Sequence, residues 1–235
     1  MDASVKFKTH ALSGLNMVLT DGVHGPSLAP TEMLLLNVGI ITVCYALLCK
    51  PSLGDKKGII TLTIFTLVAA ASRVVLEPFP NVQPLTVMCL LMGACLGARR
   101  GMAFAVMATM LSNIILSHGY WTIFQASGWA FIAFIGSKIN IVYNNELAMK
   151  KLIISSAFLS VLFDWWVSLS VYHFGMSSTE FLIYLLNGIP FDIMHAMASI
   201  FTAVWFAPAI VKLLQDYSTP DLQENSVGEA DVIIA

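Results

Sequence analysis

The stretch PLTVMCLLMGACLGARRGMAFAVMATMLSNIILS, residues 84–117, decides the fold class of this chain. It holds two apolar runs, 84–98 and 101–117, and its only charged residues are Arg99 and Arg100 between them. The runs are continuously apolar, whereas a half-buried strand would alternate apolar and polar residues. We therefore interpret the stretch as two membrane helices joined by a short basic turn.

The rest of the chain extends this pattern. Of its 235 residues, 57% are hydrophobic and 11% are charged, against about 25% charged in soluble domains. A helix needs ~20 mainly apolar residues to cross a bilayer. We predict an all-α integral membrane protein with seven spans, at 33–49, 58–76, 84–98, 101–117, 123–143, 151–171 and 189–211. The third span is short, so we expect it either to start earlier or to lie inside the bundle.

Several classes of protein are disfavoured by composition and motifs. The net charge of −2 argues against a nucleic-acid partner. No zinc-protease, serine-hydrolase or phosphate-loop motif occurs, so we assign no catalytic residue, no metal and no cofactor. The four cysteines lie in or beside apolar runs and are interpreted as small buried hydrophobes; they are Cys44, Cys49, Cys89 and Cys95.

The basic residues predict the topology. Nine of the twelve fall in alternate connections: Lys50, Lys56, Lys57, Arg99, Arg100, Lys138, Lys150, Lys151 and Lys212. The other connections, 77–83, 118–122 and 172–188, contain none. The positive-inside rule makes the basic side cytoplasmic. We therefore predict a multi-pass protein of the cell membrane, with an N-terminal segment 1–32 outside and an acidic, loose tail 215–235 in the cytoplasm.

Four ionisable residues lie inside the predicted spans: Arg73, Asp164, Asp192 and His195. Such groups are costly in a bilayer unless they are paired or hydrated, so they are candidate functional residues. The topology places all four in the outer half of the membrane. A structural interpretation stays open, in which Arg73 pairs with Asp164 or Asp192, or Asp192 begins a helix and favours its dipole.

The outer connections add polar and aromatic side chains. EPFPNVQPLT (77–86) predicts a stiff, non-helical connector. SHGYWTIFQASGW (117–129) brings Trp121, Gln125 and Trp129 close to Asn113, and YLLNGIPFD (184–192) predicts a break before the last helix. These aromatics form either an interfacial belt or part of a pocket for a planar polar molecule.

Small residues recur every fourth position at Gly93, Gly97, Gly101 and Ala105. Small residues at this spacing predict close helix packing. The string crosses the turn at Arg99 and Arg100, so it cannot be one continuous helical stripe.

The string SRVVLEPFPNVQPLTVMCLLMGACLGARRGMAFAVMATMLSNIILSHGYWTIFQASGWAFIAFIGSKI (72–139), with YLLNGIPFDIMHA (184–196), resembles the substrate-binding S-components of energy-coupling factor (ECF) transporters, in the branch that includes cobalamin-type and unassigned members. The resemblance covers residues 58–214. It lies in Pro80, Asn81, Pro84, Gly97, Arg99, Gly101, Asn113, Trp121, Thr122, Gln125, Trp129, Asp164, Gly188, Pro190, Asp192 and His195.

The resemblance implies a six-helix membrane domain over 58–214, with 33–49 as an extra N-terminal helix. It also implies capture of a vitamin-like molecule from outside, with a transmembrane coupling subunit and two cytoplasmic ATPases as partners. ATP hydrolysis would then belong to the partners, so the chain itself is predicted not to be an enzyme.

We therefore expect a substrate-capture subunit whose site comprises Arg73, Asn81, Asn113, Trp121, Gln125, Trp129, Asp164, Asp192 and His195. Trp121, Gln125 and Trp129 would stack and hydrogen-bond, and the connector that carries Asn81 would cover the site. Two other hypotheses remain open. One is a membrane enzyme acting on a lipid or isoprenoid, with Asp164, Asp192 and His195 as acid–base or metal-binding groups. The other is a structural subunit of a membrane complex.

Overall fold

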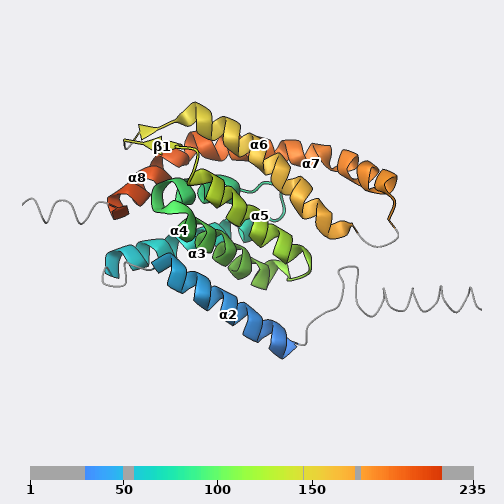
Figure 1. Cartoon of the computed structure of the whole chain (residues 1–235), viewed down its shortest axis with the longest axis horizontal. Helices are drawn as coiled ribbons and strands as arrows, with labels where there is room; N and C mark the ends of the chain where they lie inside the picture. Colours follow the sequence, from blue (N-terminus) through green and yellow to red (C-terminus); the bar gives the residue numbers. More distant parts are fainter. Residues whose placement is uncertain (1–29, 50–55, 145, 173–175, 219–235) are drawn as a thin grey trace, which may run out of the picture.

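The computed structural model describes residues 30–49, 56–144, 146–172 and 176–218. Nearly all of this part is helical (Figure 1). The elements are α2 (Pro30–Cys49), α3 (Lys56–Val75), α4 (Leu85–Leu116), α5 (Trp121–Gly136), β1 (Val142–Tyr143), β2 (Glu146–Leu147), α6 (Met149–Ser168), the 3₁₀ turn η2 (Leu169–Val171), α7 (Ser178–Trp205) and α8 (Ala207–Ser218). The predicted helical class is confirmed in this coarse form. The antiparallel pair β1–β2 was not predicted.

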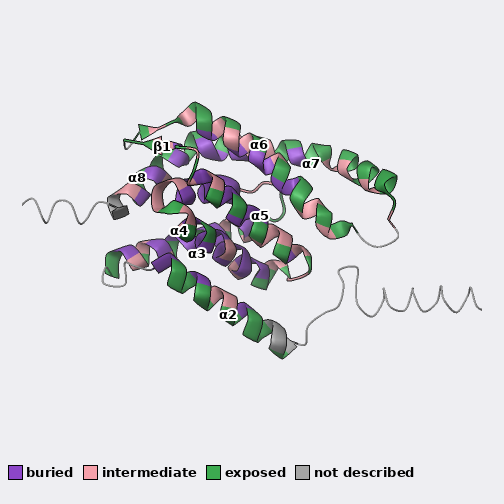
Figure 2. Cartoon of the chain, in the orientation of Figure 1, coloured by how far each residue is buried: buried purple, intermediate pink, exposed green. Residues whose placement is uncertain are grey.

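Within the described residues, four stretches are long and apolar enough to cross a bilayer: Lys56–Val75, Leu85–Leu116, Met149–Val171 and Ser178–Trp205. Large apolar side chains cover their outer surfaces, as on α7, where Ile193, Met197 and Phe201 are exposed. Figure 2 shows this exposure along α2, α6 and α7, around a buried centre. Soluble proteins rarely expose such extensive apolar surface, so the helices are compatible with a membrane protein.

Helix α4 is bent back on itself at Gly97. This residue has φ 82° and ψ 168°, outside the helical region. Residues 93 and 101 would lie about 12 Å apart in a straight helix, yet a Cβ built on Gly101 would come within 2.8 Å of the Cα of Gly93. The two arms, 85–96 and 98–116, therefore run side by side in opposite directions, as the two apolar runs predicted.

The first arm of α4 lies inside the molecule. Every residue from Leu85 to Gly93 is buried. Twelve residues span only about 18 Å, less than the ~30 Å of the hydrocarbon core. The expectation that this short run would be enclosed by the other helices is therefore confirmed.

Gly97→Ala is expected to destabilise the protein by about 1–3 kcal/mol, because only glycine adopts this φ and ψ without strain. Thermal unfolding of the detergent-purified protein would measure the change. Gly39→Ala, in α2, is the matched control, because a Cβ there meets nothing within 4 Å. If Gly97→Ala and Gly39→Ala melted at the same temperature, the expected strain at Gly97 would be contradicted.

Three helices pack so that their polar ends meet. Phe65 of α3 stacks on Phe104 of α4 with ring centroids 5.3 Å apart, and Arg73 bonds Asn113 one turn or more further along both helices. Helix α3 and the second arm of α4 therefore run parallel. Helix α5 runs antiparallel to that arm, because Asn113 bonds Thr122 whereas Gly101 lies beside Ala133.

This packing gathers eight basic residues of the described part at one end of the molecule: Lys56, Lys57, Arg99, Arg100, Lys138, Lys150, Lys151 and Lys212. The start of α3, the turn at Gly97, the end of α5, the β1–β2 hairpin and α8 lie at that end, on the left in Figure 1. The connections 76–84 and 117–120 lie at the opposite end.

Helix α7 begins eleven residues before the predicted span at 189, so the expected break at 184–192 is wrong. A capping box starts the helix: Ser177 accepts from the backbone N–H of Glu180, whose carboxylate accepts from the backbone N–H of Ser177. Pro190 lies inside the helix, where it removes one backbone donor but leaves the adjoining turns intact. Asp192 is therefore in mid-helix, which excludes its interpretation as a helix-start carboxylate.

The other boundaries differ less from the predictions. Helix α5 ends at Gly136 instead of 143, because the chain turns there into the β1–β2 hairpin. The predicted connector 77–86 is non-helical as far as Pro84, whereas Leu85 and Thr86 already belong to α4. The residues 1–29 of the N-terminal segment and 219–235 of the acidic tail lie outside the described part, while α8 continues to Ser218.

Candidate functional site

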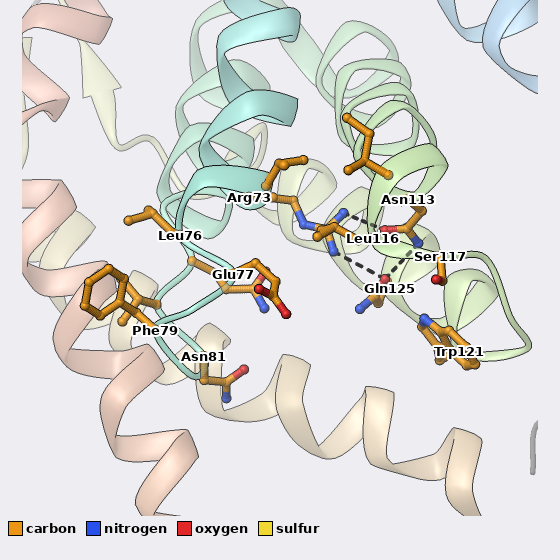
Figure 3. A pocket seen from close by; sticks show the side chains of 14 residues that line it. Arg73, Leu76, Glu77, Phe79, Asn81, Asn113, Leu116, Ser117, Trp121 and Gln125 are labelled. Carbon is orange, nitrogen blue, oxygen red and sulfur yellow. Dashed lines mark hydrogen bonds between the residues drawn. The ribbon is translucent and has the colours of Figure 1, made fainter.

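A cavity of about 480 Å³ opens at the end of the molecule opposite the basic residues. It lies between the end of α3, the connector 76–84, the end of α4 and the start of α5 (Figure 3). Five of the nine predicted site residues line it: Arg73, Asn81, Asn113, Trp121 and Gln125. Its volume falls within the range of small-molecule pockets, about 300–1,000 Å³.

The guanidinium of Arg73 is the centre of a polar network in this cavity. It reaches toward Asn113 and Gln125 (Figure 3), donating from Nη1 to Asn113 Oδ1 at 3.0 Å and from Nη2 to Gln125 Oε1 at 3.4 Å. Nη1 also donates to the hydroxyl of Ser112 and to the carbonyl of Thr109. These contacts hold the cation in one position. Arg73 is only 6% exposed.

The amides of the cavity hold one another in turn. Asn113 Nδ2 donates to Gln125 Oε1 at 3.1 Å and to Thr122 Oγ1 at 3.0 Å. Both amide oxygens therefore accept from Arg73 while the amide nitrogen of Asn113 ties α4 to α5. Side chains fixed in this way can recognise a ligand with little loss of rotamer freedom on binding.

Arg73 has no carboxylate partner within the described part of the chain, where the one ion pair is His195 with Asp164. The structural interpretation in which Arg73 pairs with Asp164 or Asp192 is therefore wrong. The reason is geometric, since Trp129 stands in between, with the guanidinium carbon 4.5 Å from its ring centroid. The ring face offsets part of the cost of burying the cation.

A second, fully buried network lies beyond Trp129. Trp129 Nε1 donates to Thr86 Oγ1 at 3.3 Å, and Thr86 Oγ1 lies 2.9 Å from His195 Nε2. His195 Nδ1 lies 3.0 Å from Asp164 Oδ1. Because an indole N–H can only donate, the chain of bonds is consistent when Thr86 donates to Nε2 and Nδ1–H donates to Asp164.

The order hydroxyl, imidazole and carboxylate is also that of a hydrolase triad. Here, however, Thr86 and His195 are both 0% exposed, and neither lines the cavity. In this conformation no substrate reaches the hydroxyl. The contacts instead tie α4, α5, α6 and α7 together.

Asp192 lies beside this network. Its carboxylate accepts from Trp165 Nε1 at 2.9 Å, and it interacts electrostatically with Asp164 and His195. The structure thus brings Asp164 of α6 together with Asp192 and His195 of α7 but separates these three residues from Arg73. Trp129, Asp164, Asp192 and His195 do not line the cavity. No group of three His, Cys, Asp or Glu placed to hold a metal occurs within the described residues.

Asn81 links the wall of the cavity to the second network. It lines the cavity, and its Nδ2 donates to Asp164 Oδ2 at 3.0 Å and to the carbonyl of Phe191 at 3.1 Å. Its φ of 59° is left-handed, a conformation that asparagine tolerates better than most residues. Asn81 therefore fastens the connector 76–84, which forms one wall of the cavity, to α6 and α7.

Asn81→Gly is expected to loosen this connector while costing only about 1 kcal/mol of stability, because it removes two hydrogen bonds without adding backbone strain. Hydrogen exchange should rise at residues 78–83 and stay unchanged in α4. Asn140→Gly is the control, since Asn140 is exposed and also has a left-handed φ, of 44°. Unchanged exchange in the Asn81 variant would show that the two bonds do not hold the connector.

The predicted site did not include two hydroxyl residues that complete these networks, or a carboxylate that lines the cavity. Thr86 and Ser112 are hydroxyls within apolar helices, and both are buried. Glu77 is an exposed carboxylate that lines the cavity one helical turn after Arg73. Their signal was weak, because a hydroxyl in a membrane helix commonly bonds its own backbone, as Ser112 also does.

Fold and site together define a mostly helical protein with apolar outer surfaces and one polar, arginine-centred cavity. Residues 55–220 match the family of unknown function DUF6580, so the chain belongs to that family. No curated protein and no solved structure matches the chain significantly.

Proposed function

We propose that this protein is a membrane-embedded binding subunit that captures a small polar micronutrient, of the vitamin type, for uptake by an ECF-like importer. The observation that carries the proposal is the Arg73-centred cavity at the end remote from the basic residues. By the positive-inside rule the basic end faces the cytoplasm, so the cavity opens to the outside. This topology supports an N-terminus outside and a C-terminus inside.

The lining of the cavity supports a solute ligand. A site for a lipid chain would be mainly apolar, whereas here a cation, four amides and the Glu77 carboxylate line one space. Trp121 supplies a ring on which a planar ligand can lie. The larger groove between α3 and α7, of about 910 Å³, is almost entirely apolar and suits lipid contact instead.

The partners in this proposal follow from the resemblance to S-components. A transmembrane coupling subunit and two cytoplasmic ATPases would supply the energy, and 58–214 would form the six-helix domain that meets them. Affinity purification from native membranes tests this part. Recovery of the chain without any ATPase would contradict the importer assignment while leaving ligand capture standing.

Binding is tested by calorimetry on the protein in nanodiscs, with B vitamins, cobalamin and queuosine precursors as the panel. At least one compound is expected to bind with a Kd below ~100 μM, about −5.5 kcal/mol. If every compound fails and no small molecule co-purifies, capture is contradicted. Turnover of a lipid or isoprenoid would instead favour the membrane-enzyme hypothesis.

Trp121→Ala is expected to weaken the binding of that compound roughly 10-fold, ~1.4 kcal/mol, because the variant loses the ring contact in the cavity. Trp205→Ala is the matched control, since Trp205 is 69% exposed at the far end of α7. The same calorimetric titration measures both variants. Equal affinities for the two variants would place the ligand elsewhere.

A further inference from the structure

We propose that the cavity recognises a ligand by one carboxylate group, which Arg73 binds through the Nε and Nη2 edge of its guanidinium. The inference rests on the proposed capture function and narrows its substrate class to organic monocarboxylates. Its basis is a buried cation whose charge and hydrogen-bonding capacity are incompletely met by the protein.

The hydrogen bonds of Arg73 are unevenly distributed. Nη1 has three acceptors: Asn113 Oδ1, the hydroxyl of Ser112 and the carbonyl of Thr109. Nη2 has Gln125 Oε1 at the long distance of 3.4 Å. Nε is buried and has no hydrogen-bond partner.

The underused edge has the geometry of a carboxylate site. Two parallel N–H donors of a guanidinium match the two oxygens of a carboxylate, in a bidentate pair that is shorter and stronger than bonds to neutral acceptors. The saturated Nη1 end meanwhile fixes the plane of the group. A ligand carboxylate would therefore meet a donor pair already in position.

The charge balance of the site also favours a carboxylate ligand. The four hydrogen-bond acceptors of Arg73 are neutral, and within the described residues no carboxylate lies within ion-pair distance of it. Asp164 is engaged by His195 and Asn81, and Asp192 by Trp165. A buried cation is costly without an anion, so a bound carboxylate would supply the missing negative charge.

Glu77 restricts the class further. It is an exposed carboxylate on the same cavity, one helical turn beyond Arg73. The Glu77 carboxylate would repel a second negative charge on the ligand, whereas it would accept a hydrogen bond from a donor group. The favoured ligand thus carries one carboxylate at the Arg73 end and neutral or donor groups toward Glu77.

Pairs of compounds that differ only in the carboxylate test this inference on the wild-type protein in nanodiscs. The probes are nicotinate with nicotinamide, indole-3-acetate with indole-3-acetamide, biotin with biotinamide, and pantothenate with pantothenol, measured by calorimetry, with inorganic phosphate as a separate arm. We expect at least one acid to bind at least 10-fold more tightly than its neutral partner. This comparison requires no variant that has to fold.

Variants then locate the effect. Arg73→Met should remove the preference for the acid, and Arg73→Lys should retain part of it. Arg100→Met is the control, because Arg100 lies three residues after the Gly97 turn, at the end of the molecule opposite the cavity, and it should leave the preference unchanged. A preference that survives in Arg73→Met would overturn the assignment to Arg73.

Mass spectrometry of molecules that co-purify with the wild-type protein tests the capture function and the carboxylate inference separately. A co-purifying carboxylic acid supports both. A neutral or cationic ligand, equal binding of acids and amides, or binding of phosphate that depends on Arg73 overturns the carboxylate inference and leaves capture intact. If no molecule co-purifies and no probe binds, both fail.

Discussion

Gly93→Ala is expected to prevent accumulation of folded protein, or to destabilise it by about 3 kcal/mol or more. A Cβ at this position would lie 1.8 Å from the backbone carbonyl oxygen of Ala133. Overpacking usually costs ~1–3 kcal/mol because side chains can shift, but here the obstacle is the backbone of α5. A second contact between these helices is also too close for a methyl group, since a Cβ on Gly136 would lie 2.2 Å from the carbonyl oxygen of Leu90.

The consequence reaches the cavity because α4 and α5 supply Asn113, Trp121 and Gln125 to its lining. Separating the two helices would pull Asn113 away from Thr122 and Gln125, and Arg73 would lose its acceptor on α5, Gln125 Oε1. Domains are stable by only about 5–15 kcal/mol, so a loss of this size is a large fraction of the total.

The measurement is the yield and melting temperature of detergent-purified protein by fluorescence-detected gel filtration. Gly136→Ala should behave like Gly93→Ala. Gly39→Ala should be neutral or gain up to ~1 kcal/mol, because alanine is the better helix former and its Cβ meets open space. A folded Gly93→Ala protein with the wild-type melting temperature would show that the close approach of α4 and α5 is not required.

Asp164→Ala is expected to cost roughly 3 kcal/mol, since it leaves His195 and Asn81 without their shared acceptor in a buried site. Neutral hydrogen bonds between membrane helices are worth only ~0.6 kcal/mol on average. The larger value is expected here because His195 is 0% exposed and cannot recruit water.

A double-mutant cycle isolates this interaction. The free energies of unfolding of Asp164→Ala, His195→Ala and the double variant would be measured by denaturant titration in mixed micelles. We expect the double variant to be at least ~1 kcal/mol more stable than the sum of the single losses predicts, because each single change orphans the other partner. Trp165→Phe is the control, as Trp165 is 47% exposed and its bond to Asp192 should be worth under about 1 kcal/mol. Additive losses for Asp164 and His195 would show that the pair is not energetically coupled.

Much of the candidate site could be predicted because polar residues are scarce in apolar helices. Arg73, Asn113 and Gln125 stand out against their neighbours, and all three line the cavity. The polar connector carrying Asn81 was also recognised. What could not be predicted is the division of the set by Trp129, because contacts across helices depend on how each helix rotates about its axis.

The α7 boundary shows a different limit of local patterns. Gly188 and Pro190 predicted a break, but the capping box at Ser177 and Glu180 starts the helix earlier. The helix then continues without interruption past both residues. A proline costs one backbone hydrogen bond and some steric strain, and neighbouring turns can absorb that cost. A single residue preference is therefore weaker than the cooperative stability of a long helix.

By itself, the sequence of this protein determined the helical class, the reversal of the chain near Arg99 and Arg100, and the residues available for a polar site. These properties follow from hydropathy and charge, which act locally along the chain. Only the tertiary structure decided that Arg73 faces amides and an indole ring instead of a carboxylate, and that Asp164 pairs with His195. The physical reason is that charge pairing requires particular atoms to meet across helices, and their meeting depends on the packing of the whole bundle.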